Sequence, residues 1–196
     1  MPTRDEPSAR SGPKGPPRPQ SAAAARARVE AQKAGRADAR RAELDAAFPD
    51  GVPGRGIPAL SWTATGLLAL ATAVAAADPD RFITPFFVVA LAMFFGGSVL
   101  FAIDILLAAA RSRTHAMGIG GLFFLAGSAP RSLTVSMNLS LAVAVAVSVA
   151  GAAARPYTPL AFGTLAPLFQ LAASGLWGVR HGHFPPRPEL AARSRT

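Results

Sequence analysis

Residues 132–154 read SLTVSMNLSLAVAVAVSVAGAAA, a run of 23 residues that contains no charged side chain. A bilayer core about 30 Å thick is crossed by roughly 20 helical residues, so this run is long enough to span a membrane. Its part from Leu141 to Ala150 alternates with a period of two, which is usually typical of a strand. Both faces are apolar, however, and no polar face can line a barrel lumen. We therefore interpret the run as a transmembrane helix with small residues on much of its circumference.

Three more uncharged runs of similar length occur, at residues 56–77, 82–103 and 156–179. A chain in lipid must satisfy its backbone hydrogen bonds internally, which favours helices. The first run begins too far from the N-terminus to be a signal peptide. We predict an all-α membrane protein with a transmembrane domain at 58–184. Its four transmembrane helices are expected at 58–77, 84–109, 132–154 and 157–179.

The composition excludes several classes of protein and site. Hydrophobic residues make up 51% of the 196 residues, and only eight charged residues occur between positions 56 and 179. A soluble domain of this length would need charged side chains all along its surface. The chain has no cysteine, which excludes disulfides, thiolate metal sites and a cysteine nucleophile.

The Lys and Arg residues predict which side of the membrane each connection faces, because cytoplasmic loops are enriched in them. With the N-terminus inside, the cytoplasmic segments hold 18 of the 20 Lys and Arg residues. The outer connections then hold only Arg81 and Arg155. We therefore predict a multi-pass protein of the plasma membrane with both termini in the cytoplasm.

The segments outside the spans differ in composition. Residues 1–21 are rich in proline and poor in apolar side chains, and we predict disordered tails here and at 185–196. Residues 22–48 are rich in Ala, Arg and Glu, which predicts an exposed basic helix in the cytoplasmic tail, without contacts to the bundle. The Pro- and Gly-rich residues 49–57 are a linker.

Two interpretations of the basic helix at 22–48 remain open. It is either a solvated helix or a helix that rests on anionic inner-leaflet lipids, where each nearby Lys or Arg contributes about 1 kcal/mol. Acidic residues at positions 30, 38, 43 and 45 weaken that attraction. The segment does not favour nucleic acid as a partner, because no aromatic residues alternate with its basic ones.

A shorter apolar segment at 117–129 is harder to interpret. As a helix its 13 residues would cover only about 20 Å, which is too short for a span. We therefore expect either an interfacial or shallow re-entrant segment, or a plain loop that lies over the end of the bundle.

Polar residues inside the predicted spans are the first candidates for function, because they are expensive in lipid. Asp104 lies seven residues before Arg111, and Asn138 lies seven residues after Arg131, so both are at one depth. A hydrogen bond between them would tie adjacent helices together. The alternative is an interfacial Asp104 that reaches headgroups or water. The third candidate, Gln170, is predicted near the midplane.

The sequence shows no catalytic or metal-binding pattern. His181 and His183 are two residues apart, but no carboxylate or cysteine accompanies them. No phosphate-binding glycine loop and no pair of carboxylates occurs within the spans. We therefore expect no catalytic residues, no cofactor, no metal and no enzymatic activity.

Small residues four positions apart indicate faces where membrane helices approach closely. The expected packing residues are Ser136, Ser140, Ala144 and Ser148 on the third span, Ala92 and Gly96 on the second, and Ser174 and Gly178 on the fourth. Pro159 and Pro167 predict a kink in the fourth span. Tyr157 and Trp177 are expected at its two ends as interfacial aromatic residues.

Two elements carry a resemblance to a known family. They are Ala129-Pro-Arg131-Ser and the closing block, which begins Arg155-Pro-Tyr-Thr-Pro and ends Gly175-Leu-Trp-Gly-Val-Arg-His-Gly-His-Phe-Pro-Pro-Arg187. Over roughly residues 55–188 the chain resembles a family of small, uncharacterised four-helix membrane proteins from high-GC actinobacteria. The resemblance implies an integral plasma-membrane protein with no assigned activity, and it supplies no catalytic residues.

Two functions remain open at this point. The first is a non-enzymatic accessory or scaffold protein of the cell envelope, which works with a membrane-protein partner or as a homo-oligomer. The second is a small oligomeric transporter or channel with Asp104, Asn138 and Gln170 along its path. The scarcity of polar groups and the abundance of small-residue faces favour the first.

Overall fold

The computed structural model describes residues 22–49 and 51–187, and its regular elements are helices. Three long helices are α2 (Gly56–Ala77), α3 (Pro79–Arg111) and α5 (Arg131–Ala154). The last stretch, Pro159–His181, contains a 3-10 helix at Pro159–Leu165 and then α6 (Leu168–His181). By length and composition all four can cross a membrane, which is the architecture of a multi-pass membrane protein.

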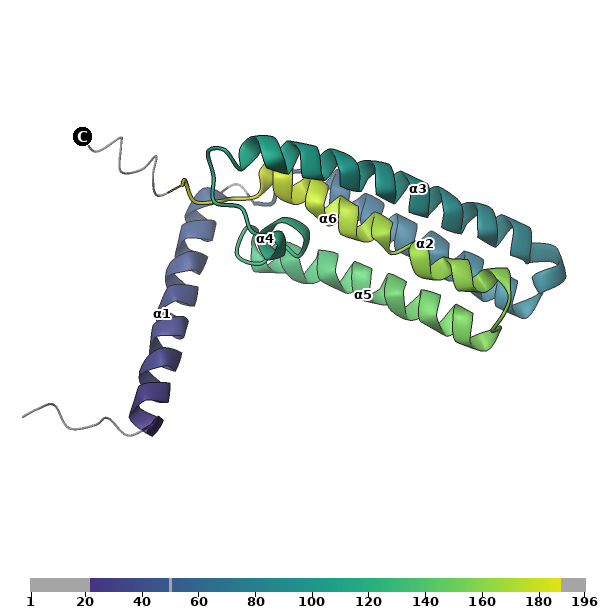
Figure 1. Cartoon of the computed structure of the whole chain (residues 1–196), viewed down its shortest axis with the longest axis horizontal. Helices are drawn as coiled ribbons and strands as arrows, with labels where there is room; N and C mark the ends of the chain where they lie inside the picture. The colour runs from purple at the N-terminus through teal and green to yellow at the C-terminus, as the bar shows by residue number, and fades with distance from the viewer. Residues whose placement is uncertain (1–21, 50, 188–196) are drawn as a thin grey trace, which may run out of the picture. The chain divides into compact units, whose positions relative to one another are not determined.

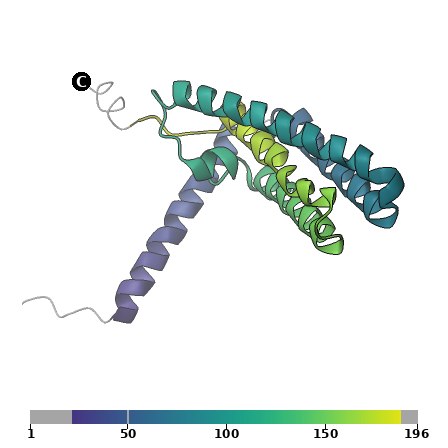
Figure 2. The same ribbon diagram turned by 45° about the vertical axis from the view of Figure 1, so that its right-hand side comes forward.

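The four stretches form a bundle (Figures 1 and 2), in which α3 packs against α6 and α2 packs against α5. One apolar cluster fills the middle of the bundle: Leu68, Ala75, Phe86, Ala90, Met93, Ala144, Leu160 and Ala166. Large apolar side chains also cover the outside, such as Leu70 and Leu106 with exposed fractions of 63% and 71%. Polar groups inside and apolar groups outside are the pattern expected of helices in lipid.

The predicted second helix begins earlier and ends later than expected. α3 starts at Pro79, because the Asp78 side chain accepts a hydrogen bond from the Arg81 backbone N–H at 3.4 Å and Pro79 occupies a first-turn position. Arg81 is thus part of the helix and not a charge that bounds it. At the other end the helix reaches Arg111.

The prediction of one α-helix at 157–179 is wrong in its first half. Tyr157 has a positive φ of 64°, and a 3-10 helix runs from Pro159 to Leu165 before α6 begins at Leu168. Pro167 has no backbone N–H to donate, so it caps α6 instead of continuing a helix through that point. The expected kink is therefore a change of helix type.

The segment at 117–129 folds over one end of the bundle. Its residues Ile119–Phe123 form the short helix α4, and Leu122, Phe123 and Leu125 are buried. A Cβ added at Gly178 of α6 would lie 2.5 Å from the carbonyl oxygen of Leu122, so only glycine permits this approach. We call this end of the second compact unit, made by residues 39–49, 51–57, 111–131 and 181–187, the tail end.

The helix α1 (Ala22–Ala47) belongs to two compact units, residues 1–38 and 39–196. In the first unit every described side chain, from position 22 to position 38, is exposed. The predicted disordered tails lie outside the described residues, except that 185–187 of the second tail are extended. There, Pro186 forms an isolated bridge with His115.

The expectation that residues 22–48 make no contact with the bundle is wrong for their last ten residues. Leu44 is buried, and the ring of Phe48 lies 6.1 Å from that of Trp177. Trp177 is itself fully buried and donates its Nε1–H to the Pro53 carbonyl oxygen at 2.9 Å. The prediction of Trp177 as an interfacial aromatic residue is therefore wrong, because the tail covers it.

Candidate functional site

The sequence nominated Asp104, Asn138 and Gln170, and the structure places them in three different environments. Gln170 belongs to a chain of buried side chains that joins three helices. Its amide Nε2 donates to Thr65 Oγ1 at 3.2 Å, and Thr65 and Ser140 hydroxyls lie 3.3 Å apart. Ser140 in turn lies 2.6 Å from the Ser61 hydroxyl. This series of hydrogen bonds links polar side chains of α2, α5 and α6.

Asp104 is fully buried between α3 and α6. Neither of its carboxyl oxygens has a hydrogen-bond partner among the described residues. A Cβ added at Gly175 would lie 2.6 Å from Asp104 Oδ2 and 2.7 Å from a ring carbon of Phe123. The carboxyl group therefore occupies tightly packed space against a glycine and an aromatic ring.

The expected hydrogen bond between Asp104 and Asn138 does not form. The Asn138 amide Nδ2 donates instead to the carbonyl oxygens of Phe124, at 2.9 Å, and Thr134, at 2.8 Å. Counting from the arginines predicts one depth for the two residues, but Asp104 lies against Gly175 of α6, while Asn138 faces the segment after α4. The alternative of an Asp104 that reaches headgroups or water is also wrong, because the side chain has no exposed surface.

The predicted small-residue faces are right on two helices and displaced on the third. Ser140, Ala144 and Ser148 are buried on α5, while Ser136 is partly buried and accepts from the Trp62 indole at 3.0 Å. Ser174 and Gly178 are buried on α6. On α3, however, Ala92 is exposed and Gly96 only partly buried.

The close approach on α3 occurs one residue later, at Gly97. A Cβ there would lie 2.7 Å from the backbone nitrogen of Phe169. The buried face of α3 therefore runs through Ala90, Met93, Gly97 and Asp104. The small-residue pattern favours Gly96, which has Ala92 four positions before it, whereas Gly97 has the large Met93 at that spacing, so the pattern points to the wrong glycine.

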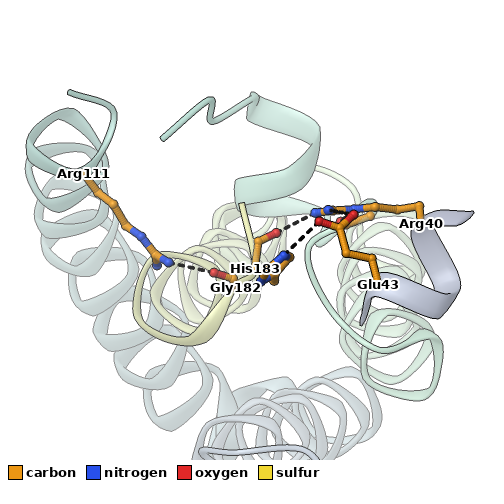
Figure 3. Close-up of polar contacts among 6 residues, drawn as sticks. Arg40, Glu43, Arg111, Gly182 and His183 are labelled. Atoms are coloured by element: carbon orange, nitrogen blue, oxygen red, sulfur yellow. Dashed lines mark hydrogen bonds and ion pairs between the residues drawn. The ribbon is translucent and has the colours of Figure 1, made fainter. Parts of the chain in front are cut away.

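Arginine side chains bind backbone carbonyl oxygens at the tail end (Figure 3). Arg111 donates to the carbonyl oxygens of Val179, at 2.5 Å, and Gly182, at 2.9 Å, where α6 ends. Arg40 donates from Nε to the Gly127 carbonyl oxygen and from Nη2 to that of His183, both at 2.7 Å. These bonds satisfy carbonyl groups that helix ends and loops leave without partners.

Glu43 completes this network. Its carboxylate lies 2.6 Å from Arg40 Nη1 and 3.2 Å from His183 Nε2 (Figure 3). The hydrogen bond from Arg40, followed by that with His183, lowers the pKa of Glu43 below its usual value of 4.5. The sequence analysis missed Arg40 and Glu43, because a charged helix beside a Pro/Gly linker is typical of a solvated segment, and it considered His183 only as a metal ligand. The only local signal was an Arg three residues before a Glu.

An open groove lies beside this network, with a volume of about 430 Å³. Its walls come from four parts of the chain and include Arg40, Glu43, Gly118, Ser128 and Phe184. The groove combines open space with the charged side chains of Arg40 and Glu43. It is the candidate binding site of the described residues.

The histidines do not gather into a metal site. The ring of His181 lies 5.7 Å from that of Trp177, whereas His115 Nδ1 lies 2.8 Å from the Thr114 hydroxyl. Across residues 22–49 and 51–187, no group of three His, Asp or Glu side chains is placed to hold a metal ion.

The chain was compared with models of protein families, with curated proteins and with solved structures. None of the three comparisons found a match.

Proposed function

We propose that the protein is a non-enzymatic accessory or scaffold component of a bacterial cell-envelope assembly, in the plasma membrane and with both termini in the cytoplasm. The four apolar spans and the distribution of Lys and Arg support this location. In this role the four helices hold a fixed shape and present their outer faces to a partner protein or to a second copy.

One observation supports this proposal most strongly, namely how tightly the interior of the bundle is filled. Asp104 and Gln170 are the polar side chains that a conduction path would need, and both are fully buried. The space beside Asp104 does not even admit a methyl group at Gly175. Gln170 is bonded to Thr65 across helices. Polar groups used in this way join helices and do not line a pore.

The experiment that tests this proposal is isolation of the full chain from its native membranes after cross-linking, with quantification of co-isolated proteins. A scaffold component is expected to bring a partner, or a second copy, in fixed proportion. Purified protein in sealed vesicles is expected to conduct neither protons nor small ions. Monomeric protein that conducts and brings no partner would contradict the proposal.

A second function, a small transporter, is favoured by one specific observation. Both oxygens of Asp104 and the Oε1 atom of Gln170 are buried without a hydrogen-bond partner among the described residues. Unsatisfied buried acceptors are costly and often mark a site that binds something. Flux in vesicles that Asp104→Asn abolishes, and that the control Asp80→Asn at an exposed position leaves unchanged, would establish this function instead.

A further inference from the structure

The groove at the tail end has the size of a small-ligand site. Its volume of about 430 Å³ lies within the range of roughly 300–1,000 Å³ that is usual for such sites. Residues of α1, of the segment around α4 and of the stretch after α6 form its walls. It therefore lies where the membrane-spanning helices α3 and α6 end and α5 begins.

The charged wall of the groove offers both a cation and an anion. Arg40 and Glu43 are 2.6 Å apart, with side-chain exposures of 25% and 49%. The bonds of Arg40 to Gly127, Glu43 and His183 use three of the five N–H groups of a guanidinium, so it can donate further. A ligand with one charge would meet one opposite and one like charge here. A ligand with both charges matches the pair.

Apolar side chains, among them Phe184 and Pro185, form part of the groove wall. Ile119 and Phe124 do not line the groove, but they belong to the same segment around α4 and have exposed fractions of 76% and 46%. In a membrane, exposed apolar side chains at the end of a bundle can contact lipid chains. The ligand that fits such surroundings has a charged head and an apolar body.

We propose that this groove binds the headgroup of a phospholipid that carries a primary amine, of the phosphatidylethanolamine class. The ammonium group donates to the Glu43 carboxylate, and the phosphate accepts from the Arg40 guanidinium. The acyl chains lie against Ile119 and Phe124. This inference goes beyond the proposed scaffold function and does not depend on it.

Native mass spectrometry of the full chain, released from vesicles, tests the proposal. Vesicles contain equal parts of phosphatidylethanolamine, phosphatidylglycerol and phosphatidylcholine. Wild-type protein is expected to retain one phosphatidylethanolamine in preference to the others. Glu43→Gln and Arg40→Gln are each expected to lower this retention roughly tenfold, as loss of a charge-assisted hydrogen bond implies. Asp45→Asn and Arg41→Gln, which make the same changes outside the groove, are expected to retain it.

Arg40→Gln also removes the hydrogen bonds from Arg40 to Gly127 and His183, so a second variant must block the groove without changing those bonds. A Cβ at Gly118 meets nothing within 4 Å, so Gly118→Leu fills the groove and leaves both charges in place. It is expected to lower retention as well, while Gly66→Leu on α2, whose Cβ also meets nothing within 4 Å and which does not line the groove, is not. Equal retention of all three lipids, a preference for phosphatidylglycerol, or wild-type retention by Gly118→Leu would overturn the proposal.

Discussion

Gly175 of α6 has no side chain, which allows Asp104 of α3 to pack closely against it. We expect Gly175→Ala to destabilise the bundle, because its Cβ would lie 2.6 Å from Asp104 Oδ2 and 2.7 Å from the Phe123 ring. Overpacking of this kind costs about 1–3 kcal/mol. The control is Gly66→Ala on α2, whose Cβ meets nothing within 4 Å. The measurement is the free energy of unfolding in detergent. Equal values for the two variants would show that α3 and α6 can move apart at no cost.

Glu43 gives the tail end a dependence on pH. Its pKa is lowered on folding, chiefly by the hydrogen bond from Arg40, so the ionised carboxylate stabilises the folded contact. That contribution is present above the ordinary value of 4.5 and is lost as the pH falls through the lowered pKa. We expect the contact between residues 40–43 and the bundle to loosen on acidification.

Spin labels can measure this loosening, because the chain has no cysteine of its own. Labels at Ala46 and Ala126, both exposed, are expected to give a narrow distance distribution at neutral pH and a broad one in acid. In Glu43→Gln the distribution should no longer change with pH, whereas Asp45→Asn should behave like wild type. If the distance distribution of Glu43→Gln broadens in acid as that of the wild type does, another titratable group causes the loosening.

The sequence predicts which segments form the membrane-spanning helices, because hydrophobicity determines them. It misses which face each helix turns to its neighbour, because a few contacts between side chains determine that. Four spans follow from the uncharged runs, because lipid permits few alternatives. The choice of Gly97 over Gly96 depends on how α3 rotates against Phe169, which spacing does not encode. The number of residues that separates each of Asp104 and Asn138 from its nearest arginine predicts that both lie at the same depth. Their different directions depend on the fold of the segment around α4, where Phe124 offers its carbonyl oxygen to Asn138.

The composition of α1 predicts an exposed helix and gives no sign that its C-terminal end packs against the bundle. Leu44 is buried in a helix that is otherwise almost entirely exposed, so we expect Leu44→Asp to release residues 39–48 from the bundle. Loss of a buried leucine removes about 1.5–3 kcal/mol of stabilisation. Limited proteolysis with trypsin tests this prediction: the released segment of Leu44→Asp should be cleaved after Arg40 faster than that of the wild-type protein.

The matched control is Val29→Asp in the first compact unit, where the side chain is already 49% exposed. This variant should be cleaved after Arg40 at the wild-type rate. If both variants are cleaved at that rate, Leu44 does not hold the helix end against the bundle.

For the whole molecule, the charges predict one orientation in the membrane. Of the Lys and Arg residues described in the second compact unit, at positions 39–49 and 51–187, only Arg81 and Arg155 lie at the end opposite the tail end. Both are engaged locally, since Arg155 donates to the Ala76 carbonyl oxygen at 3.0 Å and Arg81 lies over the Phe82 ring. The other Lys and Arg residues of this unit lie toward the tail end, and the positive-inside rule predicts that this end faces the cytoplasm.

Single cysteines test this orientation in intact cells. Cysteine at Asp80 or at the fully exposed Tyr157 is expected to react with an impermeant thiol reagent. Cysteine at Ser11 or Ser194 should react only after the cells are opened, because those positions follow the N-terminus and C-terminus to the cytoplasmic side. The opposite labelling pattern would invert the topology. It would also move the groove of Arg40 and Glu43, and the lipid proposed to bind it, to the outer leaflet.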